Sequence, residues 1–114
     1  MDGGNLPIDE LLGVKAVESI DFSGRGLSTM SAIIIGACIA GNRHLRELKL
    51  VDNSLGDEGW GAIFAAVCGS RISKITSIDA SSGGISPEGA KLIGKALRNS
   101  VNASVTSVRA SIGW

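Results

Sequence analysis

The chain has 114 residues, of which 44% are hydrophobic and 4% aromatic, and its 11 basic and 11 acidic residues balance to zero formal net charge. This length is enough for one domain, and the charge balance gives no long-range attraction to nucleic acid or to an anionic membrane surface. The most apolar run, residues 32–40, falls far short of the ~20 residues that span a bilayer. We therefore expect a buried helix there and no membrane span.

The chain contains two cysteines, and no secretory leader is recognisable at its start. Both features favour an intracellular, reducing compartment, most simply the cytoplasm.

The first 16 residues are predicted to form an N-terminal cap. Residues 7–12 have the pattern of a short helical turn, with Ile8, Leu11 and Leu12 available to cover the first structural unit. The outermost units of a stacked array need such a cover, because stacking leaves one of their faces bare.

Four similar stretches follow the cap and define the organisation of the chain. They begin at Val17, Leu45, Ile75 and Val105, which are 28, 30 and 30 residues apart. Alternation of apolar and polar residues in each stretch predicts a strand. The side chains expected to face inward are Val17, Ile20 and Phe22; Leu45, Leu48 and Leu50; Ile75, Ile78 and Ala80; and Val105, Val108 and Ala110.

Each of the first three strands is predicted to lead through a turn into a helix. The turns are rich in Gly, Asn and Ser and end at Leu27, Leu55 and Ile85. Ser86 and Pro87 form a strong helix start, as an N-cap followed by a first-turn proline. Counting equal distances from the turn residues predicts these inward helix positions: Ile34, Ala62 and Leu92; Ile35, Ile63 and Ile93; Cys38, Ala66 and Ala96; Ile39, Val67 and Leu97.

Two of these units, LRELKLVDNSLGDEGWGAIFAAV and ITSIDASSGGISPEGAKLIGKAL, resemble leucine-rich repeats of the ribonuclease-inhibitor-like subtype. The resemblance implies a right-handed α/β solenoid that forms a single domain over residues 1–114. About four parallel strands would line its concave side and three helices its convex side. The turn asparagine of the family is present as Asn53, but Arg25 and Gly83 occupy the equivalent places, and Trp60 replaces the family's helix-start alanine. The family implies a curved protein-binding scaffold.

On the predicted sheet, one outward column reads Asp21, Lys49, Asp79 and Arg109. Alternating charges at this spacing can pair with one another. The column is either a polar binding strip or a sheet that satisfies its own charges, and the pairing favours the second interpretation.

The outward positions of the first two helices are unusually apolar. They are Ile33, Gly36, Ala37, Trp60, Gly61, Phe64, Ala65 and Cys68. A contiguous apolar patch on a helix layer marks an interface, so we expect a protein partner to dock here with Trp60 and Phe64 as anchors. In the alternative interpretation the helices are rotated and these residues complete the core.

The C-terminal end forms a second candidate interface. Val108, Ala110, Ile112 and Trp114 follow the last repeat start with no further helix to cover them. Either the chain is a fragment of a longer protein, or a partner covers this end, or Trp114 folds back over it.

No residue pattern indicates catalysis. The single histidine, His44, has no acid or nucleophile partner in a recognisable triad, and Cys38, Cys68 and His44 make a weak metal set. We expect no enzyme, cofactor, metal or small-molecule substrate. The sequence predicts a non-catalytic protein-interaction module that joins a hetero-complex or self-associates. The alternative is an obligate structural subunit of a large complex, which in one version is associated with a membrane.

Overall fold

The computed structural model describes the backbone of residues 6–101 and 107–112, and the side chains of residues 6–80 and 85–101. A short helix, α1 (Ile8–Leu12), precedes three strand–helix units and a last strand. These are β1 (Ser19–Asp21) and α2 (Thr29–Ile39), β2 (Glu47–Lys49) and α3 (Gly56–Cys68), β3 (Ser77–Ile85) and α4 (Pro87–Arg98), and β4 (Ser107–Ile112).

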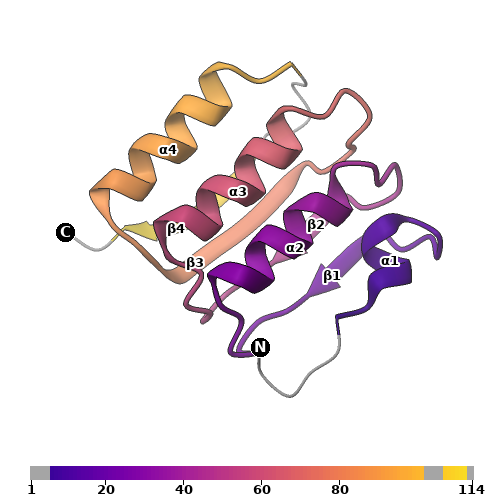
Figure 1. Ribbon diagram of the computed structural model, residues 1–114, viewed down its shortest axis with the longest axis horizontal. Helices are drawn as coiled ribbons and strands as arrows, with labels where there is room; N and C mark the ends of the chain where they lie inside the picture. The colour runs from indigo at the N-terminus through magenta and orange to yellow at the C-terminus, as the bar shows by residue number, and fades with distance from the viewer. Residues whose placement is uncertain (1–5, 102–106, 113–114) are drawn as a thin grey trace.

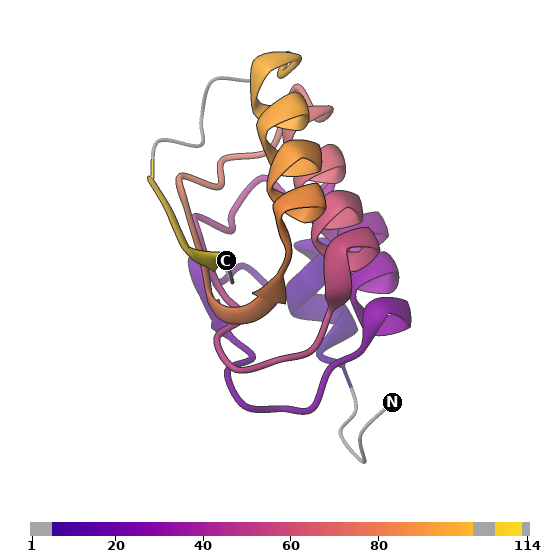
Figure 2. The same ribbon diagram turned by 90° about the vertical axis from the view of Figure 1, so that its left-hand side faces the viewer.

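The strands form one open sheet in the order β1-β2-β3-β4, and each pairs in parallel with the next. Figure 1 shows α2, α3 and α4 side by side over this sheet, and Figure 2 shows the two layers edge-on. Parallel neighbours need a long crossover between them, which the helix of each unit supplies. The expected mixture of helices and parallel strands is confirmed.

The core lies between the two layers and is aliphatic. Its strand-side members are the inward residues predicted for the first three strands, from Ile20 and Phe22 to Ile78 and Ala80. Val17 is only partly buried at its edge. α1 is formed as expected, but only its Leu11 is buried, while Ile8 and Leu12 remain exposed. The cap therefore covers the first unit through Leu11 and the partly buried Leu6.

One predicted turn is wrong. Residues 81–84, SSGG, were expected to turn the chain, but β3 runs unbroken from Ser77 to Ile85. Its pairing with β4 shifts register between Ala80 and Ile85. The strand is therefore longer than β1 and β2, and Figure 2 shows its end curving toward α4.

The helix starts follow capping chemistry in two units and backbone geometry in the third. The Ser28 hydroxyl accepts a hydrogen bond from the Ser31 amide, and the Ser31 hydroxyl accepts one from the Ser28 amide. Ser86 caps α4 by accepting from the Gly89 amide, with Pro87 in the first turn. α3 has no side-chain cap and begins at Gly56, whose φ of +72° suits glycine.

The helices are rotated relative to the orientation predicted from sequence. The buried positions of α2 are Ser31, Ala32, Ile35, Gly36 and Ile39, and those of α3 are Gly59, Trp60, Ile63, Phe64, Val67 and Cys68. Five residues predicted to face inward are buried, namely Ile35, Ile39, Ile63, Val67 and Ile93, but in α2 and α3 the buried stripe extends from them to the flank opposite the predicted one. Ile34, Leu92 and Leu97, predicted to face inward, are exposed.

Side-by-side helix packing explains this rotation. A Cβ added to Gly36 would lie 3.2 Å from the Ala62 carbonyl oxygen, and one added to Gly59 would lie 3.0 Å from the Ala32 Cβ. These glycines allow α2 and α3 to approach closely, so one flank of each helix is buried by its neighbour as well as by the sheet. Gly36, which the sequence assigned to an external docking face, therefore serves a contact within the chain.

Candidate protein-binding surfaces

An apolar groove runs along the outer surface between α3 and α4. Its volume is about 450 Å³, and it is lined by Glu58, Gly61, Ala65, Cys68, Gly69, Leu92, Lys95, Ala96 and Asn99. Small residues on α3 lower one wall, while Leu92, 45% exposed, stands on the other. Glu58 and Lys95 supply one charge of each sign. This hollow offers an apolar surface between charged borders.

Exposed aliphatic side chains form a second apolar surface on α2. Met30 is 65% exposed, Ile33 42% and Ile34 38%, and Ala37 is exposed beside them. No charged residue lies within α2. The helix face therefore keeps the apolar character expected from sequence, with partly different members.

The two predicted anchors of that face do not belong to it. Trp60 and Phe64 are both fully buried, and their ring centroids lie 6.4 Å apart in a tilted arrangement. Gly36 and Cys68 are buried as well, whereas Gly61 is partly and Ala65 well exposed. The aromatic pair fills the space between α3 and the sheet, so it contributes to the core and cannot meet a partner directly.

The predicted charge column is aligned by the sheet register. Asp21 pairs in register with Lys49, and Lys49 with Asp79, which pairs with Arg109. The Lys49 ammonium nevertheless lies 4.0 Å from Glu47 of its own strand. The pKa of Asp21 is lowered, chiefly because Ser23 donates hydrogen bonds to its carboxylate, with a smaller contribution from Lys49. These interactions favour a sheet face that satisfies its own charges.

The predicted C-terminal surface lies largely outside the described residues. Val108, Ala110 and Ile112 belong to β4, but their side chains and the whole of Trp114 lie outside the described residues. Their role remains a prediction.

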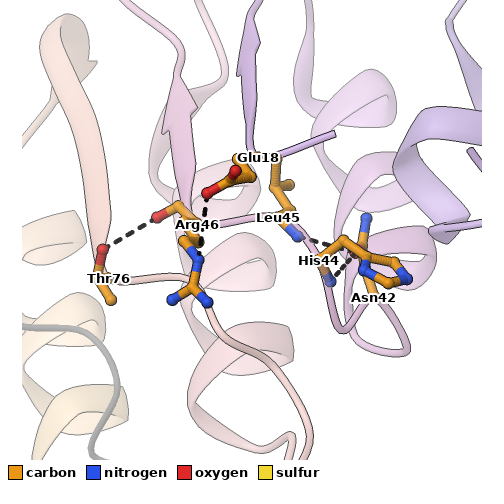
Figure 3. Close-up of polar contacts among 6 residues, drawn as sticks. All are labelled: Glu18, Asn42, His44, Leu45, Arg46 and Thr76. Carbon is orange, nitrogen blue, oxygen red and sulfur yellow. Dashed lines mark hydrogen bonds and ion pairs between the residues drawn. The ribbon is translucent and has the colours of Figure 1, made fainter. Parts of the chain in front are cut away.

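Buried polar residues in the helix-to-strand loops were not predicted from sequence. Asn42 is fully buried: its amide group donates to the carbonyls of Glu10 and Leu11, and its side-chain oxygen accepts from the amides of His44 and Leu45. Figure 3 shows Asn42 beside His44 and Leu45 in this loop. The residue ties the loop before β2 to the end of α1.

A similar hydrogen-bonding side chain recurs in the loops of the next two units. The Ser70 hydroxyl donates to the Ala40 carbonyl after α2 and accepts from the amides of Ile72 and Ser73. Ser100 donates to the Cys68 carbonyl at the end of α3. Asn42, Ser70 and Ser100 are 28 and 30 residues apart, which repeats the spacing of the first strands. The recurrence of a short polar residue at this spacing is the feature of the sequence that could have indicated these loop hydrogen bonds.

Asn53 performs a related task at the opposite ends of the strands. Its side-chain oxygen accepts from the amides of Arg25 and Leu27, while its amide group donates to the carbonyls of Phe22 and Leu50. A buried backbone group without such a partner would be costly. One asparagine therefore satisfies the turns of two units.

Little in the described part of the chain indicates metal or thiol chemistry. Cys38 and Cys68 are free thiols, and burial raises the pKa of the Cys68 thiol. Among the residues placed by the structure, no three His, Cys, Asp or Glu side chains gather as a metal site. In the same residues, no helix has the length and apolarity needed to cross a bilayer.

Comparison with known proteins supports the repeat interpretation. Residues 41–64 match the sequence model of the family described as leucine-rich repeat. No curated protein sequence shows a significant match to the chain. The fold resembles a solved structure of the leiomodin-1 actin-binding site 2, with a TM-score of 0.79 at 17% sequence identity over 91% of this chain.

This chain matches 59% of the length of that solved chain. At 17% identity the likeness shows a shared fold. The matched segment contains β2 and most of α3, the central unit of the structure. The family match and the fold together support a leucine-rich repeat protein.

Proposed function

We propose that the chain is a non-catalytic protein-binding module whose helix face receives a protein partner. The observation that carries the proposal is the apolar groove between α3 and α4, and exposed aliphatic residues on α2 add to the apolar surface of the same helix layer. Contiguous apolar surface of this kind is typical of interaction sites. The fold supports the proposal because the units leave their helix layer free along the described chain.

The finer architecture belongs to the same proposal. We regard the strand–helix units as turns of a right-handed solenoid of the ribonuclease-inhibitor-like subtype. The in-register parallel strands and the recurring loop hydrogen bonds of Asn42 and Ser70 support regular stacking. The Asn53 hydrogen bonds support the subtype, since an asparagine at this turn is the family's bracing residue.

The groove is tested by charge insertion at Ala65. This side chain is exposed on α3, so Ala65→Arg should leave the fold intact while placing a cation in the groove. The matched control is Ser54→Arg, in an exposed loop outside the groove. With both variants and the unmodified chain as baits, a partner should be lost only with Ala65→Arg. Retention by all three baits would contradict the helix-face proposal.

Actin is one defined partner to examine first, because a solved structure that shares this fold is described as an actin-binding site of leiomodin-1. Co-sedimentation with filamentous actin, using the same three proteins, would detect it. Binding that Ala65→Arg abolishes would support both the partner and the groove. Binding that Ala65→Arg leaves unchanged would support actin but move the contact away from the groove.

An obligate structural subunit remains the second candidate, and the exposed aliphatic residues of α2 are the observation that favours it. Such a subunit should self-associate when purified alone, whereas a free module should sediment as a monomer. Analytical ultracentrifugation distinguishes the two. We also propose an intracellular, reducing location and no nucleic-acid binding, supported by the two free thiols and the balanced charge.

A further inference from the structure

Three exposed cations lie together where the helix-to-strand loops meet. Arg43, Arg71 and Lys74, with Ile72, line a hollow of about 180 Å³, and we call this set the basic loop edge. All three cationic side chains are exposed, and none forms an ion pair or hydrogen bond with another residue in the described part of the chain. By contrast, the nearby Arg46 pairs with Glu18 at 3.5 Å (Figure 3).

A second hollow adjoins the first and shares Arg43 with it. Its volume is about 310 Å³, and its lining is Ala16, Val17, Glu18, Arg43, His44 and Arg46. The two hollows therefore form a continuous surface across the loops before β2 and β3. The zero net charge of the whole chain conceals this local excess of positive charge.

The loops that carry these cations are held in place by the hydrogen bonds of two buried polar side chains. Asn42 ties its loop to the end of α1, and Ser70 ties its loop to the end of α2. Arg43 directly follows Asn42, and Arg71 directly follows Ser70. Asn42 and Ser70 also accept hydrogen bonds from amides on the far side of each arginine. The two arginines thus occupy equivalent positions in adjacent units, and their backbones need no ordering when a ligand binds.

The chemistry of the surface selects its ligand. Fixed, unpaired cations attract carboxylates, and Ile72, 37% exposed, adds an apolar contact between them. Neither hollow is lined by Phe, Tyr or Trp, so His44 is the one ring side chain available for stacking on a base, and Glu18 would repel a phosphate backbone that followed the second hollow. We propose that the basic loop edge binds an acidic peptide segment of a partner protein, one whose Asp and Glu residues flank an aliphatic side chain.

A labelled synthetic peptide tests this surface directly. The probe carries Asp and Glu on both sides of a single Leu, and fluorescence anisotropy at low and rising salt measures its dissociation constant. The unmodified chain should bind it saturably. The triple variant Arg43→Gln, Arg71→Gln, Lys74→Gln should bind about tenfold more weakly or worse, with a smaller dependence on salt.

The matched control is the triple variant Arg25→Gln, Lys91→Gln, Arg98→Gln, which makes the same change in net charge at exposed positions outside both hollows. Its affinity should stay close to that of the unmodified chain. Equal loss in both triple variants would show non-specific attraction and overturn the proposal. Absence of binding to the unmodified chain, or tighter binding of a single-stranded oligonucleotide of equal charge, would overturn it as well.

The apolar contact has its own test. Replacing the Leu of the probe by Gly should weaken binding to the unmodified chain several-fold but make no difference to the Ile72→Ser variant. Undiminished discrimination by Ile72→Ser would contradict the assigned contact. The groove variant Ala65→Arg should bind the peptide normally, so failure of the groove proposal and failure of this one are distinguishable.

Discussion

The carboxylate of Asp57, in the first turn of α3, accepts two hydrogen bonds from Ser86, the N-cap residue of α4. The Ser86 backbone amide donates to Asp57 Oδ1 at 3.0 Å, and the Ser86 hydroxyl donates to Oδ2. Gly89 makes room for this contact, because a Cβ at that position would collide with the Asp57 carboxylate. The pair joins the starts of two neighbouring helices.

This pair predicts an acid dependence of stability. The hydrogen bonds from Ser86 lower the pKa of Asp57 in the folded chain, whereas an unfolded Asp titrates near its ordinary value of about 3.9. The contribution is therefore present above the unfolded pKa and is lost as the pH falls through the folded pKa. Asp57→Asn should lower stability at neutral pH, and the difference from the unmodified chain should shrink in acid.

Urea unfolding at a series of pH values measures this effect. Glu88→Gln is the matched control, since Glu88 is exposed in the first turn of α4 and pairs only with Lys91 on the helix surface. Parallel pH profiles for Asp57→Asn and the unmodified chain would rule out the linkage.

The burial of the aromatic pair predicts that truncation damages the fold. Phe64→Ala and Trp60→Ala each empty a fully buried site, and such changes typically cost about 3–5 kcal/mol. Ile33→Lys, on the exposed side of α2, should change stability by no more than about 0.5 kcal/mol. Thermal and urea unfolding provide the comparison. A Phe64→Ala chain as stable as the unmodified one would place this ring outside the core.

The burial of Trp60 and Phe64 also shows which part of the structure could not be predicted from the sequence. The strand residues alternate so regularly that the inward positions of the first three strands follow from the pattern alone, as Leu48 and Ile78 illustrate. In the helices, apolar residues surround α2 on every side, so periodicity could not define its buried face. The face of α2 that is buried depends on which flank of the helix meets α3, and the close approach of the two helices at Gly36 and Gly59 decides it.

The basic loop edge could not be predicted from the sequence for a different reason. Composition sums charges over the chain and gives zero, but the loops bring Arg43, Arg71 and Lys74 together across about 30 residues of sequence. Their grouping depends on the buried hydrogen bonds of Asn42 and Ser70, whose spacing is visible in the sequence only after their role is known.

Asn42 should anchor the N-terminal helix. Replacing it by Ala would leave the carbonyls of Glu10 and Leu11 and the amides of His44 and Leu45 without this side chain's hydrogen bonds. Each group left unsatisfied costs about 1–3 kcal/mol when it stays dry, so a loss of several kcal/mol is the upper expectation.

Hydrogen exchange locates the loss. Amides of α1 and of the loop before β2 should exchange faster in Asn42→Ala, while those of α4 should be unaffected. Asn99→Ala, at an exposed position after α4, is the control for a simple loss of an asparagine. Uniform acceleration across the whole chain would show that Asn42 stabilises the fold globally and would contradict a local anchoring role.

Two helical glycines should respond to alanine in opposite directions. At Gly61 a new Cβ would meet Leu92 Cδ1 at 3.5 Å, an ordinary contact, so Gly61→Ala should gain the helix propensity of about 0.5–1 kcal/mol. At Gly36 the Cβ would press on the Ala62 carbonyl oxygen at 3.2 Å. Since a backbone atom in the packed α2–α3 contact can move only if the helices separate, overpacking should outweigh the propensity and Gly36→Ala should destabilise the chain. Equilibrium unfolding of the two variants gives the signs. Stabilisation by both would mean that α2 and α3 are less tightly packed than their positions indicate.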